Sequence, residues 1–163
     1  MLVRCASKEA FFPLVEQLYA TQADWMKAVG ELNKIGERVK KQGIQLGFHN
    51  HNFEFQEIDG VLIYDKLMSE FDPKLVRMQF QVAVISLGYQ AATYLRKYPG
   101  RFISLHLADW SSTEKKSVPV GTGAVDWPGL WAAARPAGVK NYFVEMDLEA
   151  LKASYPYLHS LKA

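Results

Sequence analysis

Short apolar segments that favour β-strands alternate with helical segments along this chain. The strand-like segments are LVRCA (2–6), IQLGFHNH (44–51), LVRMQFQV (75–82), RFISLHLAD (101–109), SVPVG (117–121) and YFVEMD (142–147). A strand, a helix and a second strand in series form a crossover, which places both strands parallel in one sheet with the helix packed on it. We therefore predict an α/β fold with a mostly parallel sheet of six strands, in a single domain over residues 1–163.

The helical segments are marked by their apolar faces, caps and breakers. The segment 24–41 places one apolar face on Trp25, Val29, Leu32, Gly36 and Val39. Thr21 and Asp24 before it have the spacing of a capping box. Further helices are predicted over 64–71, 90–98, 127–137 and 148–161, and Pro156 is expected to kink or interrupt the last one.

Polar residues follow the apolar part of several strand-like segments. These strand ends carry His49, His51, Gln81, His106, Asp109, Glu145 and Asp147. In parallel α/β folds the functional residues gather at the carboxyl ends of the strands. Three of the four histidines are therefore expected at one rim of the sheet.

Charge and cysteine content narrow the class of protein. The 19 basic and 17 acidic residues form no long block of like charge, so neither nucleic-acid nor membrane binding is predicted. The single cysteine, Cys5, excludes an internal disulfide and suits a reducing compartment. No apolar run approaches the ~18 residues of a membrane span, and the N-terminus lacks a signal-peptide pattern. A cytoplasmic protein is expected.

Four stretches of the sequence together resemble the xylose-isomerase-like sugar phosphate isomerases and epimerases. They are DWMKAVGELNKIGERVKKQGIQLGFHNHNFEF, PGRFISLHLAD, VPVGTGAVDW and NYFVEMD, in that order. The resemblance implies a (β/α)8 barrel in which one residue from each of four strands holds a divalent metal, usually manganese, zinc or magnesium. The ligands that it implies here are His49, Gln81, His106 and Glu145.

Two positions depart from the pattern of that family. Gln81 stands where the family has an aspartate, so the implied site loses one negative ligand and its affinity for a metal should fall. Ala108 stands where relatives often carry a lysine, which removes a possible cation for substrate binding. These losses leave two hypotheses open, an enzyme or a noncatalytic carbohydrate-binding or scaffold protein derived from such enzymes.

The enzyme hypothesis is a metal-assisted isomerase, epimerase or related lyase that acts on a sugar, keto-sugar or cyclitol. Such chemistry needs a base that removes a C–H proton and an electrophile that stabilises the resulting oxyanion. The resemblance points to Glu145 and Glu54 as the acid/base pair, and His51 and Asp109 are expected to bind substrate. Two questions stay open. Glu54 could instead cap a loop, and only one of His49 and His51 is expected to face the barrel centre, because they alternate along a strand end; the sequence does not show which.

The chain is short for a complete barrel, which typically has about 250 residues. By the resemblance, 2–6 matches the third strand, so the first two βα units are expected to be absent. Three explanations compete: a fragment of a longer gene, a natural short form that dimerises, and a chain whose helices close the gap. Unpaired parallel edges favour association, and a homodimer is predicted.

Overall fold

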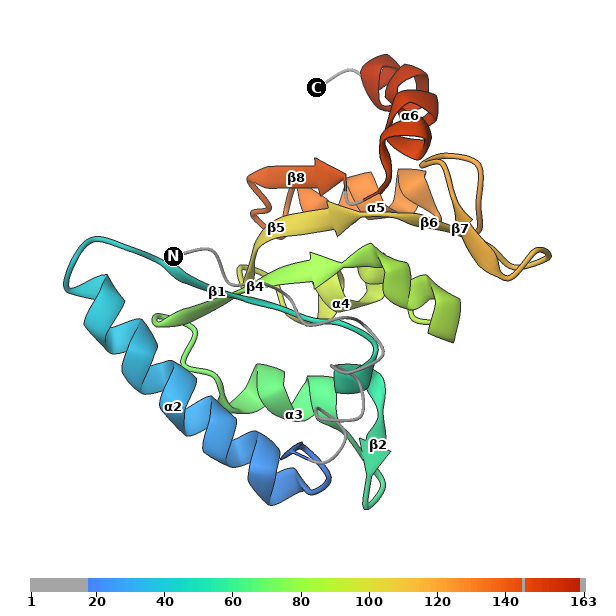
Figure 1. The fold of residues 1–163 in the computed structure, drawn as a ribbon. Helices are drawn as coiled ribbons and strands as arrows, with labels where there is room; N and C mark the ends of the chain where they lie inside the picture. Colours follow the sequence, from blue (N-terminus) through green and yellow to red (C-terminus); the bar gives the residue numbers. More distant parts are fainter. Residues whose placement is uncertain (1–17, 145, 162–163) are drawn as a thin grey trace.

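A computed structural model of the chain describes residues 18–144 and 146–161 (Figure 1). Four parallel strands form the central sheet in the order β1 (Leu46–His49), β4 (Val76–Gln81), β5 (Phe102–Leu107) and β8 (Asn141–Val144). Each strand is connected to the next by a segment that contains a helix. The prediction of an α/β protein with a parallel sheet is confirmed, and the arrangement is that of a partial (β/α)8 barrel.

The helices fall where the caps and breakers place them. They are α2 (Gln22–Lys40), α3 (Ile63–Glu70), α4 (Ala91–Lys97), α5 (Trp127–Ala134) and α6 (Leu148–Ser160). In Figure 1, α2 and α3 lie beside the β1 end of the sheet and α6 lies beyond β8. Helix α6 continues through Pro156 and is not interrupted there, so this proline removes one helical donor without ending the helix.

The longest helix, α2, begins with the expected capping box. The Thr21 side chain accepts a hydrogen bond from the Asp24 backbone N–H, and the Asp24 carboxylate accepts one from the Thr21 backbone N–H. The face of α2 that contacts the rest of the molecule buries Trp25, Val29 and Gly36. A Cβ at Gly36 would lie 3.0 Å from the Leu75 backbone oxygen, so glycine lets α2 approach the sheet closely.

The helix-covered face of the sheet is apolar and rich in aromatic rings. Val76, Met78 and Phe80 alternate along β4 and are fully buried. The Phe80 ring lies 5.6 Å from the ring of Tyr64 on α3 and 5.5 Å from that of Tyr94 on α4, as centroid distances. Phe55 stacks on Tyr64 at 4.6 Å. Because these contacts bury one side of β4, the residues between them project from the other face of the sheet.

The prediction that 117–121 adds a strand to the parallel sheet is wrong. This segment contains β7 (Lys116–Val118), which pairs antiparallel with β6 (Asp109–Ser111) outside the parallel sheet. A parallel pairing needs a crossover of a dozen or more residues, and the connection 112–115 is too short for one. The expected strand at 2–6 lies outside the described residues. Within 18–144 and 146–161 the parallel sheet therefore has four strands rather than six.

The segments that follow the strands gather at one side of the sheet. The short helix η1 (Phe53–Phe55) and the hairpin of β2 (Glu57–Ile58) with β3 (Val61–Leu62) follow β1, and η2 (Val82–Leu87) follows β4. Figure 1 shows these segments and the β6–β7 hairpin on the side of the strands' carboxyl ends. In the part of the chain that the structure describes, no helix is long and apolar enough to cross a membrane.

Candidate functional site

Three of the four implied metal ligands lie on neighbouring strands at the carboxyl rim. His49 ends β1, Gln81 ends β4, and His106 lies near the end of β5. Gln81 and His106 are paired in the register of β4 and β5. The ring centroids of His49 and His106 are 4.4 Å apart at an interplanar angle of 62°. Because β4 separates their strands, the two imidazoles meet across the strand that carries Gln81.

A polar face of the sheet leads to this rim. Gln79 alternates with the buried apolar residues of β4, and its Nε2 donates to Ser104 Oγ on β5 at 2.9 Å. His49 is paired with Gln79 in register. The face opposite the helices therefore carries hydrogen-bonding side chains, as expected for the interior wall of a barrel near its functional end.

Gln81 makes two hydrogen bonds within the part of the chain that the structure describes. Its backbone N–H donates to Asn50 Oδ1 at 3.2 Å, and its Oε1 accepts from the Ala83 backbone N–H at 3.2 Å. The second bond caps η2 at its N-terminus. The Gln81 side chain is buried, so these contacts fix the orientation of its amide at the rim. Asn50, a residue that the sequence interpretation did not select, is itself fully buried between His49 and His51.

Glu54 lies on η1, and its side chain is almost fully buried. Its Oε2 accepts a hydrogen bond from the His51 backbone N–H at 2.8 Å, and it is only 5% exposed. Burial raises the pKa of the Glu54 carboxyl above its ordinary value, and the hydrogen bond from His51 opposes this rise. The exposed His51 places its ring 4.7 Å from that of His49.

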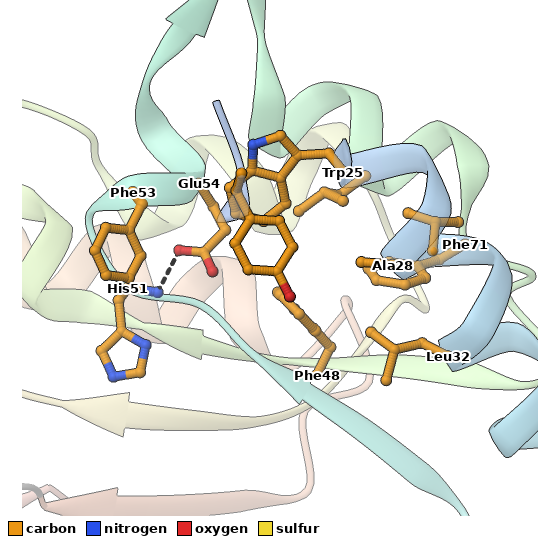
Figure 2. Close-up of a pocket in the computed structure, with 11 residues that line it drawn as sticks. Trp25, Ala28, Leu32, Phe48, His51, Phe53, Glu54 and Phe71 are labelled. Carbon is orange, nitrogen blue, oxygen red and sulfur yellow. Dashed lines mark hydrogen bonds between the residues drawn. The ribbon is translucent and has the colours of Figure 1, made fainter. Parts of the chain in front are cut away.

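The carboxyl of Glu54 faces a small pocket of about 160 Å³. Figure 2 shows this carboxyl turned toward the His51 N–H, with Phe48 and Trp25 nearby. The other lining residues come mainly from α2 and α3 and are almost all apolar. His49, Gln81 and His106 are not among the lining residues. Glu54 therefore faces a space between β1 and its covering helices, apart from the three rim residues.

Asp109 is buried beneath the loop that follows the β6–β7 hairpin. Its two oxygens accept hydrogen bonds from the backbone N–H groups of Trp110, Gly121, Gly123 and Val125 and from Trp127 Nε1. With 1% exposure, this carboxylate holds the loop 119–127 in place. Its expected contact with a substrate stays a prediction.

Asp147 and Glu145 are the last of the predicted rim residues. Asp147 is the N-cap of α6, where its Oδ1 accepts from the Ala150 N–H at 2.8 Å. Glu145, the fourth implied ligand and a predicted catalytic residue, lies outside the described residues.

The rim that the structure describes offers few ligands for a divalent metal. Among residues 18–144 and 146–161, no group of three or more His, Cys, Asp or Glu side chains is arranged to hold a metal ion. The rim does bring together two imidazoles, His49 and His106, and the amide of Gln81. These nitrogen and neutral oxygen donors suit zinc or manganese in kind, and they lack negative charge.

Comparison with known proteins identifies related sequences. No protein-family model matches the chain. The inosose dehydratase of Lacticaseibacillus casei is 25% identical over 163 residues, which covers 88% of this chain and 53% of that protein. The inosose dehydratase of Clostridium beijerinckii is 30% identical over 100 residues, which covers 60% of this chain and 33% of that protein.

Solved structures share the fold. A sugar phosphate isomerase/epimerase from Parabacteroides distasonis superposes with a TM-score of 0.76 at 25% identity and covers 86% of this chain and 54% of its own. A xylose isomerase domain protein from Planctomyces limnophilus gives a TM-score of 0.66 at 15% identity, over 88% of this chain and 53% of its own. An L-ribulose 3-epimerase gives a TM-score of 0.58 at 16% identity, over 88% of this chain and 49% of its own.

These similarities confirm the resemblance that the sequence motifs indicate. The chain has the fold of part of a xylose-isomerase-like sugar phosphate isomerase/epimerase barrel. It spans about half the length of the relatives and structures that match most of it.

Proposed function

We propose that the chain is part of a metal-assisted enzyme that moves protons on a sugar, keto-sugar or cyclitol, as an isomerase, epimerase or dehydratase. The observation that carries this proposal is the contact of the His49 and His106 rings across β4, 4.4 Å apart at the carboxyl rim. The similarity to inosose dehydratases and to sugar epimerases supports the substrate class.

In this proposal the rim residues hold the cation and the carboxylates move protons. His49 and His106 donate ring nitrogens, and Gln81 offers its amide oxygen. A bound divalent ion supplies an electrophile that stabilises negative charge on a substrate oxygen. Glu145 is the proposed base that takes the proton from the carbon next to the carbonyl, and isomerisation, epimerisation and elimination of water all begin with this step.

Glu54 has weaker support as the partner acid. The raised pKa of its carboxyl suits an acid, because the protonated form persists to a higher pH. However, it lines the pocket beside α2 rather than the rim. Its bond to the His51 N–H instead supports a role in holding His51, the proposed substrate-binding residue, at the rim.

Titration of chelator-treated protein with Mn²⁺ and Zn²⁺ by calorimetry tests the proposal. We expect one ion per chain, and we expect His49→Ala and His106→Ala each to weaken binding strongly. His159→Ala is the matched control, because His159 is exposed on α6. Binding of less than ~0.1 ion per parent chain would refute metal-assisted chemistry, since the mechanism depends on that electrophile.

A noncatalytic carbohydrate-binding protein is the second candidate. The observation that favours it is Gln81, a neutral residue whose carbonyl oxygen already caps η2. Under this reading, sugars or cyclitols bind equally well in the presence of a chelator. Calorimetric titration with inosose and with ketohexoses, with and without EDTA, separates the two functions.

A further inference from the structure

Asn50 occupies an unusual position at the end of β1. The register of β1 with β4 ends at the pair of His49 and Gln79. One residue later, a side-chain oxygen takes the place of a backbone carbonyl as the acceptor: Asn50 Oδ1 accepts a hydrogen bond from the Gln81 N–H at 3.2 Å. The side chain thus continues the connection between the two strands beyond their last backbone pair.

The Asn50 amide is only partly satisfied. The residue is 0% exposed, and its Nδ2 has no hydrogen-bond partner among the residues that the structure describes. A buried polar group without a partner costs about 1–3 kcal/mol. Since the Gln81 N–H requires an acceptor, the amide is oriented with its oxygen toward β4. The nitrogen side of the amide, Nδ2, is therefore left buried without a partner among the described residues, and this lowers the stability of the fold.

We infer that Asn50 is a positioning residue that sets Gln81 relative to the two rim histidines. This inference rests on the proposed function. Asn50 joins the strand of His49 to the backbone of Gln81, and Gln81 is paired in register with His106. Loss of the Asn50 bond would let the carboxyl end of β4 move away from β1. Asn50 itself does not touch the ion; it acts through the Gln81 backbone.

The test separates positioning from a general loss of stability. Asn50→Ala removes the acceptor, and we expect Mn²⁺ and Zn²⁺ affinity to fall about 10-fold or more, as is typical when a group that orients a ligand is lost. Asn33→Ala is the matched stability control. Asn33 on α2 also joins two backbone groups, accepting from the Asp72 N–H and donating to the Glu70 carbonyl, but these groups precede β4 and so lie at the opposite end of that strand from Gln81. It should lower the melting temperature and leave metal affinity unchanged.

Two further variants complete the design. Asn52→Ala removes an exposed asparagine two residues away that makes no side-chain cap bond, and it should change neither quantity. Asn50→Asp keeps an oxygen that accepts from the Gln81 N–H, so we expect it to bind metal at least as tightly as the parent. It also provides a folded comparison if Asn50→Ala does not fold.

The outcomes distinguish this inference from the proposed function. If the parent binds metal and Asn50→Ala lowers only the melting temperature, as Asn33→Ala does, the positioning role is wrong and the proposed function stands. If Asn50→Asp loses affinity, the bond to Gln81 is not the cause and the inference also falls. A parent chain that binds neither ion overturns both.

Discussion

The indole Nε1 of Trp127 donates a hydrogen bond of 2.8 Å to Asp109 Oδ2, and so joins the start of α5 to the start of β6. Four backbone N–H groups converge on the same carboxylate. An acceptor-only group suits this position, because the five hydrogen bonds that the described residues make to Asp109 all come from donors. The loop 119–127 is thereby folded around a single buried negative group.

Asp109→Asn is expected to destabilise the protein strongly. An amide presents an N–H₂ group to backbone donors, so at least one donor loses its acceptor, and the loss should be about 3 kcal/mol or more. Urea unfolding followed by circular dichroism measures it. The same change at Asp126, which makes a single exposed cap bond to the Gly129 N–H, should alter stability by less than about 0.5 kcal/mol. Equal effects of both variants would contradict the role of Asp109.

Gly123→Ala and Gly30→Ala should have opposite effects on stability. A Cβ at Gly123 would collide with Asp109 Oδ1 and the Trp110 carbonyl, so the loop must shift and stability should fall. A Cβ at Gly30 meets nothing within 4 Å, and Gly30 is inside α2, so alanine there should stabilise by about 0.5–1 kcal/mol. Thermal unfolding of both variants provides the comparison. A neutral Gly123→Ala would show that the loop tolerates the added methyl group.

Gln81→Asp should tighten metal binding. It returns a negative oxygen to a rim that has two neutral imidazoles, and we expect a gain of about tenfold, on the order of 1.4 kcal/mol. Aspartate is a favoured N-cap, so the cap of η2 should survive the change. Calorimetry with Mn²⁺ on parent and variant measures the gain. No gain would mean that Gln81 does not face the ion that the histidines hold.

The buried carboxyl of Glu54 predicts a specific dependence of stability on pH. Its pKa is raised in the folded state, so the folded chain binds the proton more tightly than the unfolded chain. This contribution is present below the unfolded value of about 4.3 and is lost as pH rises through the folded pKa. Glu54→Gln should therefore gain stability relative to the parent as pH rises from 4 to 8, while its amide oxygen still accepts from the His51 N–H.

Chemical denaturation of both proteins at several pH values measures the difference. Glu57→Gln, an exposed change on β2, supplies the baseline. If the difference between Glu54→Gln and the parent is the same at pH 4 and pH 8, the carboxyl is not desolvated in solution.

Much of the fold was predictable because its helices and strands are marked by signals between residues that are close in the sequence. The capping box at Thr21 and the period of α2 depend on residues a few positions apart, and the apolar segments of β1, β4 and β5 end where polar residues begin. The segment SVPVG was predicted as a further strand because it is apolar. It instead contains part of β7, which pairs with β6 in a hairpin, and only the short connection 112–115 excludes a crossover. The buried polar residues were harder to predict, because their partners are distant in sequence: the Asn50 oxygen accepts from the Gln81 N–H, 31 positions away, and Asp109 accepts from donors up to 18 positions away.

Self-association is the last prediction, and β8 is the strand that carries it. Within the described residues β8 pairs only with β5, and its segment Asn141–Val144 has no charged residue. Tyr142 and Phe143 on it are 42% and 49% exposed. An uncharged edge with exposed aromatic rings favours pairing with another chain.

Light scattering after size-exclusion chromatography at micromolar concentration should therefore show twice the 18.5 kDa of one chain. Phe143→Lys places a charge on the edge and should shift the protein toward monomer, because a buried unpaired ammonium opposes strand pairing. Leu87→Lys is the control, since Leu87 is 48% exposed at the end of η2, away from β8. A stable parent monomer of 18.5 kDa would contradict the homodimer, and dissociation by both variants alike would show that pairing does not depend on the β8 edge.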